Sequence, residues 1–340
     1  MADIPNKKPT SYDVAKLAGV HRSAVSRAFS DGKSISDETR RKVVEAAQSI
    51  GYRVNYLARG LHAQNSGLVG IVASRLETSH RARQVKLISG ELVKSGFTPI
   101  LLTADGVEDL RGHMSGLLNF NVSGMIITSD TPPPDIIEEC SHLSVPVVLI
   151  NRAPSVAGAD RVQLDIKAAG RMAFQMLHEA GATRFGVLEP KAQTYSVVGR
   201  AREFAQNCKS EGFDVTIIKT EEQSYKDGLA ASDDIQSALD SFDGIFCTTD
   251  LMAFGVLDGL RIRHDVSVPE QVRILGFDDA DQAEWSGYNL STISQNIEDS
   301  GKVAVELMMK RLADPSRILE TRTIALTSVH RGTTHQRPKF

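Results

Sequence analysis

The sequence predicts a small helical head followed by an α/β body made of two doubly wound parallel-sheet subdomains. Apolar residues recur at helical spacing in the first fifty residues. From Gly67 onward, apolar runs of strand length alternate with amphipathic stretches of helix length, beginning with 68–73, a helix over about 83–94 and 97–104. The alternation restarts at Arg184, and unalternating strands separated by helices indicate parallel sheets. Two similar halves imply a cleft between them.

The distribution of charge separates the two ends of the chain. Its 340 residues are enough for two or three domains, and their formal net charge is -3. Residues 1–65 contain 11 Lys/Arg and 6 Asp/Glu, whereas the remainder contains 28 and 36. A basic head on an acidic body suits a protein that holds a polyanion at one end only.

The cysteines and apolar segments exclude several classes of protein. Cys140, Cys208 and Cys247 are odd in number and form no C-x-x-C pair, so neither a disulfide framework nor a metal site is indicated. The N-terminus has no apolar signal region, and no apolar run approaches the roughly 18 residues of a membrane span. We therefore expect a cytoplasmic protein with no cofactor, no metal and no membrane association.

Residues 11–30 are predicted to form a helix, a tight turn and a second helix. Thr10 and Asp13 have the spacing of a helix start, and Gly19 ends the first helix. The second helix turns Val25, Ala28 and Phe29 inward and leaves a polar face suited to phosphates and base edges. That face consists of Arg22, Ser23, Ser26 and Arg27. A third helix over 37–50 ends against Gly51, and an ordinary helical hairpin with a solvated face is the alternative.

The segment VAKLAGV at 14–20, followed by AVSR at 24–27, closely resembles the DNA-binding segment of the lactose-repressor (LacI) family of bacterial transcription regulators. The resemblance implies that Arg22, Ser23 and Arg27 reach bases in a major groove, while Thr10 and Ser26 hold the DNA backbone. His21 stands where the family usually has a capping serine, and losing a hydroxyl cap costs about 1 kcal/mol. If His21 instead contacts a phosphate, DNA binding strengthens as the pH falls.

The segment from Gly51 to Ala63 resembles the family's linker and hinge (Gly-Tyr-x-x-Asn, then Ala-Arg-x-Leu). Its short helix, which contains Gly60, is expected to fold only on docking to DNA. The resemblance implies that Asn55 belongs to the DNA-binding hinge and that Leu61 inserts between base steps in the minor groove. The alternative places Leu61 against its own body. The expected domains are 1–51, a helix-turn-helix DNA-binding domain, 52–65, a linker and hinge helix, and 66–340, an effector-binding and dimerisation domain.

The body resembles the family along essentially its whole length, in segments such as 250–255, 268–272 and 276–279. The family's body is similar to periplasmic sugar-binding proteins, with a C-terminal segment that crosses back between the halves. The first half is therefore expected at about 66–160 plus 294–325, and the second at about 161–293 plus 326–340. No leucine heptad follows, so the resemblance implies a homodimer.

The resemblance also implies an effector site at the carboxyl ends of the strands. Asp165, Arg200, Asp250 and Asp278 match effector-contacting positions of the family. The alternative for each of these residues is a helix cap or a surface ion pair. Where relatives carry an aromatic pair, this chain has His80 and Arg81 instead. Because Arg81, Arg83 and Arg200 are expected near one pocket, we predict an effector with a carboxylate or phosphate, such as a sugar acid or sugar phosphate.

Together these features predict a dimeric transcriptional regulator, a repressor, that binds near-palindromic double-stranded operator DNA and is controlled by a carbohydrate-like effector. A body that answers to a protein co-regulator is the main alternative. An enzyme of sugar or nucleotide metabolism is disfavoured because G-x-G-x-x-G, P-loop, G-x-S-x-G and H-E-x-x-H motifs are absent. An uptake binding protein is disfavoured by the basic head and the missing signal peptide.

Overall fold

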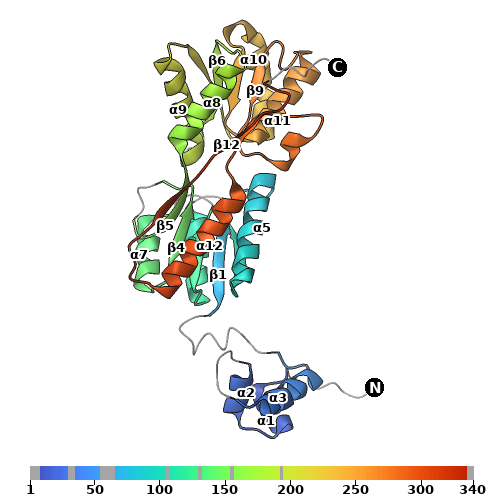
Figure 1. The fold of residues 1–340 in the computed structure, drawn as a ribbon, viewed down its shortest axis with the longest axis vertical. Coiled ribbons are helices and arrows are strands. Elements are labelled where there is room, and N and C mark those ends of the chain that lie inside the picture. The colour runs from blue at the N-terminus through green and yellow to red at the C-terminus, as the bar shows by residue number, and fades with distance from the viewer. Residues whose placement is uncertain are drawn as a thin grey trace. The chain divides into compact units, whose positions relative to one another are not determined.

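The computed structural model describes residues 8–29, 35–53, 66–104, 107–128, 132–153, 157–191 and 194–334. The chain divides into two compact units, Met1–Ser66 and Gly67–Phe340 (Figure 1). Asn55 and Leu61, which the sequence assigns to the hinge, lie outside the described residues.

The first unit contains the three predicted helices: α1 (Ser11–Ala18), α2 (Arg22–Ala28) and α3 (Asp37–Ser49). Its core is a single cluster of small apolar side chains, centred on Val14, Val25 and Val43. Gly19 ends α1 with a φ of +64°, a left-handed conformation that glycine adopts without steric cost. A three-helix head with a helix-turn-helix is thus confirmed.

The first half of the body is a six-stranded parallel sheet with the strand order β11-β5-β4-β3-β1-β2. Its strands are β1 (Leu68–Ala73), β2 (Thr98–Thr103), β3 (Gly124–Ile127), β4 (Val147–Ile150), β5 (Asp160–Leu164) and β11 (Thr321–Ile324). One face packs on α5 (Ser79–Lys94) and α12 (Ile297–Ala313). The other face packs on α6 (Val107–Asn119) and α7 (Pro134–His142).

The second half repeats this three-layer arrangement with a parallel sheet of order β7-β6-β8-β9. Its strands are β6 (Phe185–Pro190), β7 (Val215–Thr220), β8 (Gly244–Cys247) and β9 (Arg273–Leu275). Helices α8 (Ile166–Glu179) and α9 (Tyr195–Ser210) cover one face, and α10 (Tyr225–Ser237) and α11 (Asp250–Asp258) cover the other. The predicted fold class, a helix-turn-helix head with a two-subdomain α/β body, is therefore confirmed.

The chain passes between the two halves at three places, after β5, after β10 (Thr292–Ser294) and after β11. Strand β12 (Thr327–Val329) pairs antiparallel with β10, close to the junction of the halves in Figure 1. The carboxyl end of the first sheet faces this junction, because the chain leaves its parallel strands β5 and β11 there to cross to the second half.

Two expected boundaries differ from the structure, and one helix was not predicted. The second half was expected to begin at about 161, but β5 pairs with β4 and β11, so the chain leaves the first sheet only after Leu164. Helix α5 begins at Ser79 rather than Arg83, because the Thr78 hydroxyl accepts a hydrogen bond from the Arg81 N–H. Helix α7 was not predicted.

Candidate functional site

Helix α2 presents the polar face that the sequence predicted. Ala24, Val25 and Ala28 are buried against the other two helices. The four residues on the opposite face are exposed: Arg22, Ser23, Ser26 and Arg27.

The Arg22 side chain contacts the first residues of α1. Its Nε donates to the Ser11 hydroxyl at 3.3 Å, its Nη1 donates to the Tyr12 hydroxyl at 3.2 Å, and its guanidinium carbon lies 4.6 Å from the centre of the Tyr12 ring. In the same first turn of α1, the Thr10 hydroxyl and N–H both donate to Asp13. The guanidinium of Arg22 is therefore oriented by two partners before any ligand is bound.

His21 caps α2, contrary to the expectation that the cap is missing. Its Nδ1 accepts from the Ser23 N–H at 3.3 Å and lies 2.9 Å from the Ser23 hydroxyl oxygen. An imidazole nitrogen with a lone pair satisfies the helix N–H as a serine hydroxyl does. The predicted loss of cap energy is therefore wrong, and the histidine that was expected to cause it supplies the cap.

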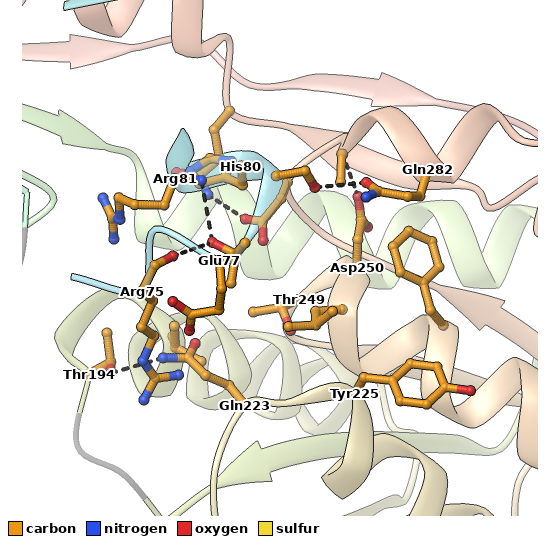
Figure 2. A pocket seen from close by; sticks show the side chains of 18 of the residues that line it. Arg75, Glu77, His80, Arg81, Thr194, Gln223, Tyr225, Thr249, Asp250 and Gln282 are labelled. Atoms are coloured by element: carbon orange, nitrogen blue, oxygen red, sulfur yellow. Dashed lines mark hydrogen bonds between the residues drawn. The ribbon is translucent and has the colours of Figure 1, made fainter. Parts of the chain in front are cut away.

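A cavity of about 310 Å³ lies between the two halves of the body. Its walls include the segments that follow β1, β4, β6, β7, β8 and β9, and ligands of parallel sheets bind at such strand ends. Figure 2 shows His80 and Arg81 on one side of the cavity, facing Asp250 and Gln282 on the other. Five of the six predicted effector residues line it: His80, Arg81, Arg200, Asp250 and Asp278.

A chain of polar side chains joins the two halves across the cavity floor. Asn151, which follows β4, donates to Gln295 at 3.0 Å, and Gln295 donates to the Asp278 carboxylate at 2.6 Å. The Asn151 side-chain oxygen in turn accepts from the Leu164 N–H. Asn151 and Gln295 were not predicted from the sequence. The clue available in the sequence was the position of Asn151 directly after a buried apolar strand.

Arg200 projects from α9 into the same network and is only 2% exposed. Its guanidinium carbon lies 4.0 Å from the centre of the Phe277 ring, and its Nη2 lies 3.9 Å from an Asp278 oxygen. Burial lowers the pKa of Arg200 to about 10, and the charges of Asp278 and Asp250 oppose that shift. Its Nε is buried without a hydrogen-bond partner in the described part of the chain. Arg200 is therefore a buried cation in the cavity lining that has one donor without a partner among the described residues.

Asp250 begins α11 and is completely buried. One carboxylate oxygen accepts from the Ala280 N–H at 2.8 Å and the other accepts from the Thr292 hydroxyl at 2.6 Å. Burial, followed by the negative charge of Asp278, raises the pKa of Asp250 to about 7. Because both oxygens already have partners within the protein, Asp250 supports the cavity wall.

Asp165 and Arg83 do not line this cavity. Asp165 is the N-cap of α8, where it accepts from the Ala168 N–H at 2.9 Å, and it lines a separate pocket beside Lys167 and Arg202. For Asp165 the structure therefore agrees with the alternative role, a helix cap. Arg83 pairs with Asp281 at 3.2 Å and with Glu298, so its charge is neutralised outside the cavity.

The second half contributes an aromatic wall that the sequence analysis also missed. Phe254 and Tyr288 pack with ring centres 4.4 Å apart, and Tyr225 and Trp285 line the cavity beside them. The Tyr225 and Tyr288 hydroxyls both donate to Asp258, at 2.6 Å and 3.1 Å. These aromatic rings give a ligand ring an apolar surface to pack on, although the first half has His80 and Arg81 where relatives carry aromatics.

In the part of the chain that the structure describes, no helix combines the length and the apolar character that a membrane span needs. Among the same residues, no three His, Cys, Asp or Glu side chains are grouped so that they could hold a metal ion.

Comparison with known proteins gives matches in both units. Residues 10–55 match the family model described as bacterial regulatory proteins, lacI family. Residues 174–334 match the periplasmic binding protein-like domain. The chain is 28% identical to the ribose operon repressor of Bacillus subtilis over 303 residues, which cover 88% of this chain and 90% of that protein. It is 29% identical to catabolite control protein A of Staphylococcus epidermidis, covering 90% and 93%.

Solved structures show the same fold. The lac repressor dimer bound to operator superposes with a TM-score of 0.85 at 21% identity, covering 97% of this chain and all of that one. A LacI family regulator from Enterococcus faecium with bound ribose gives a TM-score of 0.72 at 22% identity, covering 80% of this chain and all of that one.

Proposed function

The chain belongs to the lacI family of bacterial regulatory proteins, and from this premise we propose that it is a dimeric repressor whose hold on operator DNA is set by a small effector in the body cavity. The effector class that we propose is a polyhydroxylated molecule that carries an acidic group. The observation that carries the proposal is the cavity itself, because its lining comes from both halves of the body and contains paired polar groups beside an aromatic wall.

The head supports the DNA-binding part of the proposal. Arg22, Ser23 and Arg27 stand exposed on the second helix of a helix-turn-helix, where they are proposed to read bases. Thr10 and Ser26 are proposed to contact phosphates, with Asn55 and Leu61 acting in the hinge. The fold is shared with a lac repressor dimer on its operator, which supports a two-fold arrangement and a near-palindromic site.

The cavity supports the effector part. Its volume lies at the lower end of the range for small-molecule pockets. Carboxylates, amides and a guanidinium beside aromatic rings suit a molecule with several hydroxyl groups. Two solved structures of LacI family regulators with the same fold contain bound ribose, and a third structure with this fold contains D-xylulofuranose. An effector acts on DNA binding only by its difference in affinity for the two arrangements of the halves, typically about 1–3 kcal/mol of coupling.

A paired experiment tests the proposal. The full chain is screened by thermal shift against sugars, sugar acids and sugar phosphates, and operator affinity is measured with and without each ligand that binds, on DNA selected by the purified protein. Arg200→Met is expected to abolish the effector response and to leave operator binding intact. Arg22→Ala is expected to weaken operator binding and to leave effector binding, measured by thermal shift, intact. If ligand binding never alters operator affinity, control by a small effector is refuted. Control by a protein co-regulator is then the better explanation.

A further inference from the structure

Resting on the proposed effector role of the cavity, we propose that the amino end of α5 is an anion-binding subsite. There, the carboxylate or phosphate of the effector is held by the first-turn N–H groups of the helix and by His80, which takes up a proton as the anion binds. This assigns to His80 a function as both ligand contact and proton acceptor.

The amino end of α5 has N–H groups that are not used in hydrogen bonds among the described residues. Helix α5 runs for 16 residues, and its first turn lines the cavity through Thr78, Ser79, His80 and Arg81. The Thr78 hydroxyl satisfies the Arg81 N–H, but the N–H groups of Ser79 and His80 have no hydrogen-bond partner among the residues that the structure describes. Unsatisfied N–H groups at a helix start, together with the positive end of the helix dipole, favour an anion.

Two buried side-chain atoms, one of them on the fully buried Arg200, provide an independent observation that points to a ligand. His80 Nδ1 and Arg200 Nε are both buried without a partner in the described structure. Both side chains line the cavity, and both interact electrostatically with Asp278. A buried polar atom without a partner costs about 1–3 kcal/mol, which a bound ligand would recover.

The protonation state of His80 links the anion to a proton. The pKa of His80 is lowered, mainly by burial. The charge of Asp278 raises this pKa, and the charges of Arg81 and Arg200 lower it further. The ring also makes a hydrogen bond to the Asp278 main chain, which favours a proton on that nitrogen and leaves Nδ1 as a bare acceptor in the neutral form. An anion beside Nδ1 needs a donor there, so binding the anion raises the pKa of His80 and a proton is taken up.

One other group around the cavity titrates in the same pH range. The remaining cations of the lining are Arg75 and Arg152, and the remaining carboxylates are Glu77 and Asp250. Arg75 is paired with Glu222, and Arg152 donates to the Ile150 carbonyl. Because burial raises the pKa of Asp250 to about 7, the pH comparisons of variants below are made in an Asp250→Asn background. A neutral polyol would instead donate a hydroxyl to the bare Nδ1, and its affinity would not rise as the pH falls.

The test uses the whole chain and compares neutral sugars with acidic derivatives of the same sugars. Calorimetry at pH 6 and pH 8 compares D-ribose with D-ribonate and D-ribose 5-phosphate, and D-glucose with D-gluconate and D-glucose 6-phosphate. The pH slope is read from the carboxylates, because a phosphate monoester itself titrates near pH 6. At least one acid is expected to bind tenfold or more tightly than its neutral counterpart. Its affinity is expected to rise as the pH falls, by up to about tenfold per pH unit, with proton uptake measured in two buffers.

Variants and a direct titration make the result decisive. His80→Gln is expected to weaken acid binding and to remove its pH dependence, whereas His142→Gln, at the exposed end of α7, is the matched control. NMR titration of the His80 ring in the wild type, with and without inorganic phosphate or the sugar acids, is expected to show a raised pKa with the anion. The proposal is overturned if no anion raises that pKa, or if the pH dependence persists in His80→Gln. Operator binding by the same preparation separates this outcome from failure of the repressor function itself.

Discussion

Asp250 and His21 each have a role set by their immediate hydrogen-bond partners. The sequence placed Asp250 among the effector contacts, and the Ala280 N–H and the Thr292 hydroxyl occupy its two oxygens. His21 was expected to leave α2 uncapped, and its ring accepts from the Ser23 N–H. In both cases residue type and position alone were insufficient, because the outcome depends on which partners the fold brings within hydrogen-bonding distance.

Replacing Asp250 with Asn is expected to change how stability depends on pH. The pKa of Asp250 in the folded protein, about 7, lies above its ordinary value of 3.8, so folding favours the protonated form. The stability associated with that proton is present below about pH 4 and is lost as the pH rises through 7. Asp250→Asn avoids this loss, so its stability relative to the wild type should increase between pH 5 and pH 8, by at most a few kcal/mol. Melting temperatures that run in parallel across this range would contradict the argument.

The cap at His21 predicts a graded series of variants. His21→Ser keeps an acceptor for the Ser23 N–H and is expected to bind operator within about twofold of the wild type. His21→Ala removes the acceptor and should lower the stability of the head by about 1 kcal/mol, weakening operator affinity several-fold. Fluorescence anisotropy with labelled operator measures both. Equal affinity for His21→Ala and His21→Ser would show that the cap does not contribute to DNA binding.

Strand β5 depends on a buried ion pair that joins it to α12. The guanidinium of Arg311 donates to both oxygens of Asp160, each at 3.0 Å, and Asp160 also accepts from the Glu320 N–H at 2.8 Å. Arg311 further donates to the backbone oxygens of Pro315, Arg317 and Ile318. One pair therefore holds β5, α12 and the segment that leads into β11.

Breaking this pair from one side is expected to be costly. Asp160→Asn leaves Arg311 as a buried charge without its counter-ion, and such changes typically cost about 3–5 kcal/mol. Removing both charges, as in Asp160→Asn with Arg311→Met, should recover part of that loss. Chemical denaturation of the single and double variants measures the difference. A double variant that is as unstable as the sum of the two single variants would indicate that the charges do not act as a pair.

The same pair explains a limit of sequence-based prediction. Most strands could be predicted because they are unbroken apolar runs buried on both faces, as in β1 and β4. Strand β5 begins with Asp160 and Arg161, which resemble a loop until Arg311, 151 residues away in the sequence, is seen to neutralise Asp160. Prediction of the site residues from the sequence was limited for the same reason. Asn151, Gln295 and the aromatic wall belong to segments whose proximity is created only by the three crossings between the halves.

At the scale of the whole body, polar contacts on the rim of the cavity hold the two halves in their present arrangement. Arg75 pairs with Glu222 at 2.7 Å, and Arg83 pairs with Asp281 at 3.2 Å. Between them, the Ser79 hydroxyl donates to Gln282 at 2.7 Å. Each contact joins the first half to the second, so each favours the closed arrangement over one in which the halves have separated.

Loss of one rim pair is expected to weaken effector binding modestly. Because Arg75 and Glu222 are partly exposed, their pair should contribute about 0–1 kcal/mol, and Arg75→Gln should raise the effector Kd by no more than about fivefold. Added salt should reduce the difference, since exposed charges are screened. The exchanged pair Arg75→Glu with Glu222→Arg should restore affinity, whereas Arg111→Gln, which breaks the exposed pair with Asp135 inside the first half, should have no effect. If the exchanged pair binds effector as weakly as Arg75→Gln does, Arg75 acts on the ligand directly and not by holding the halves together.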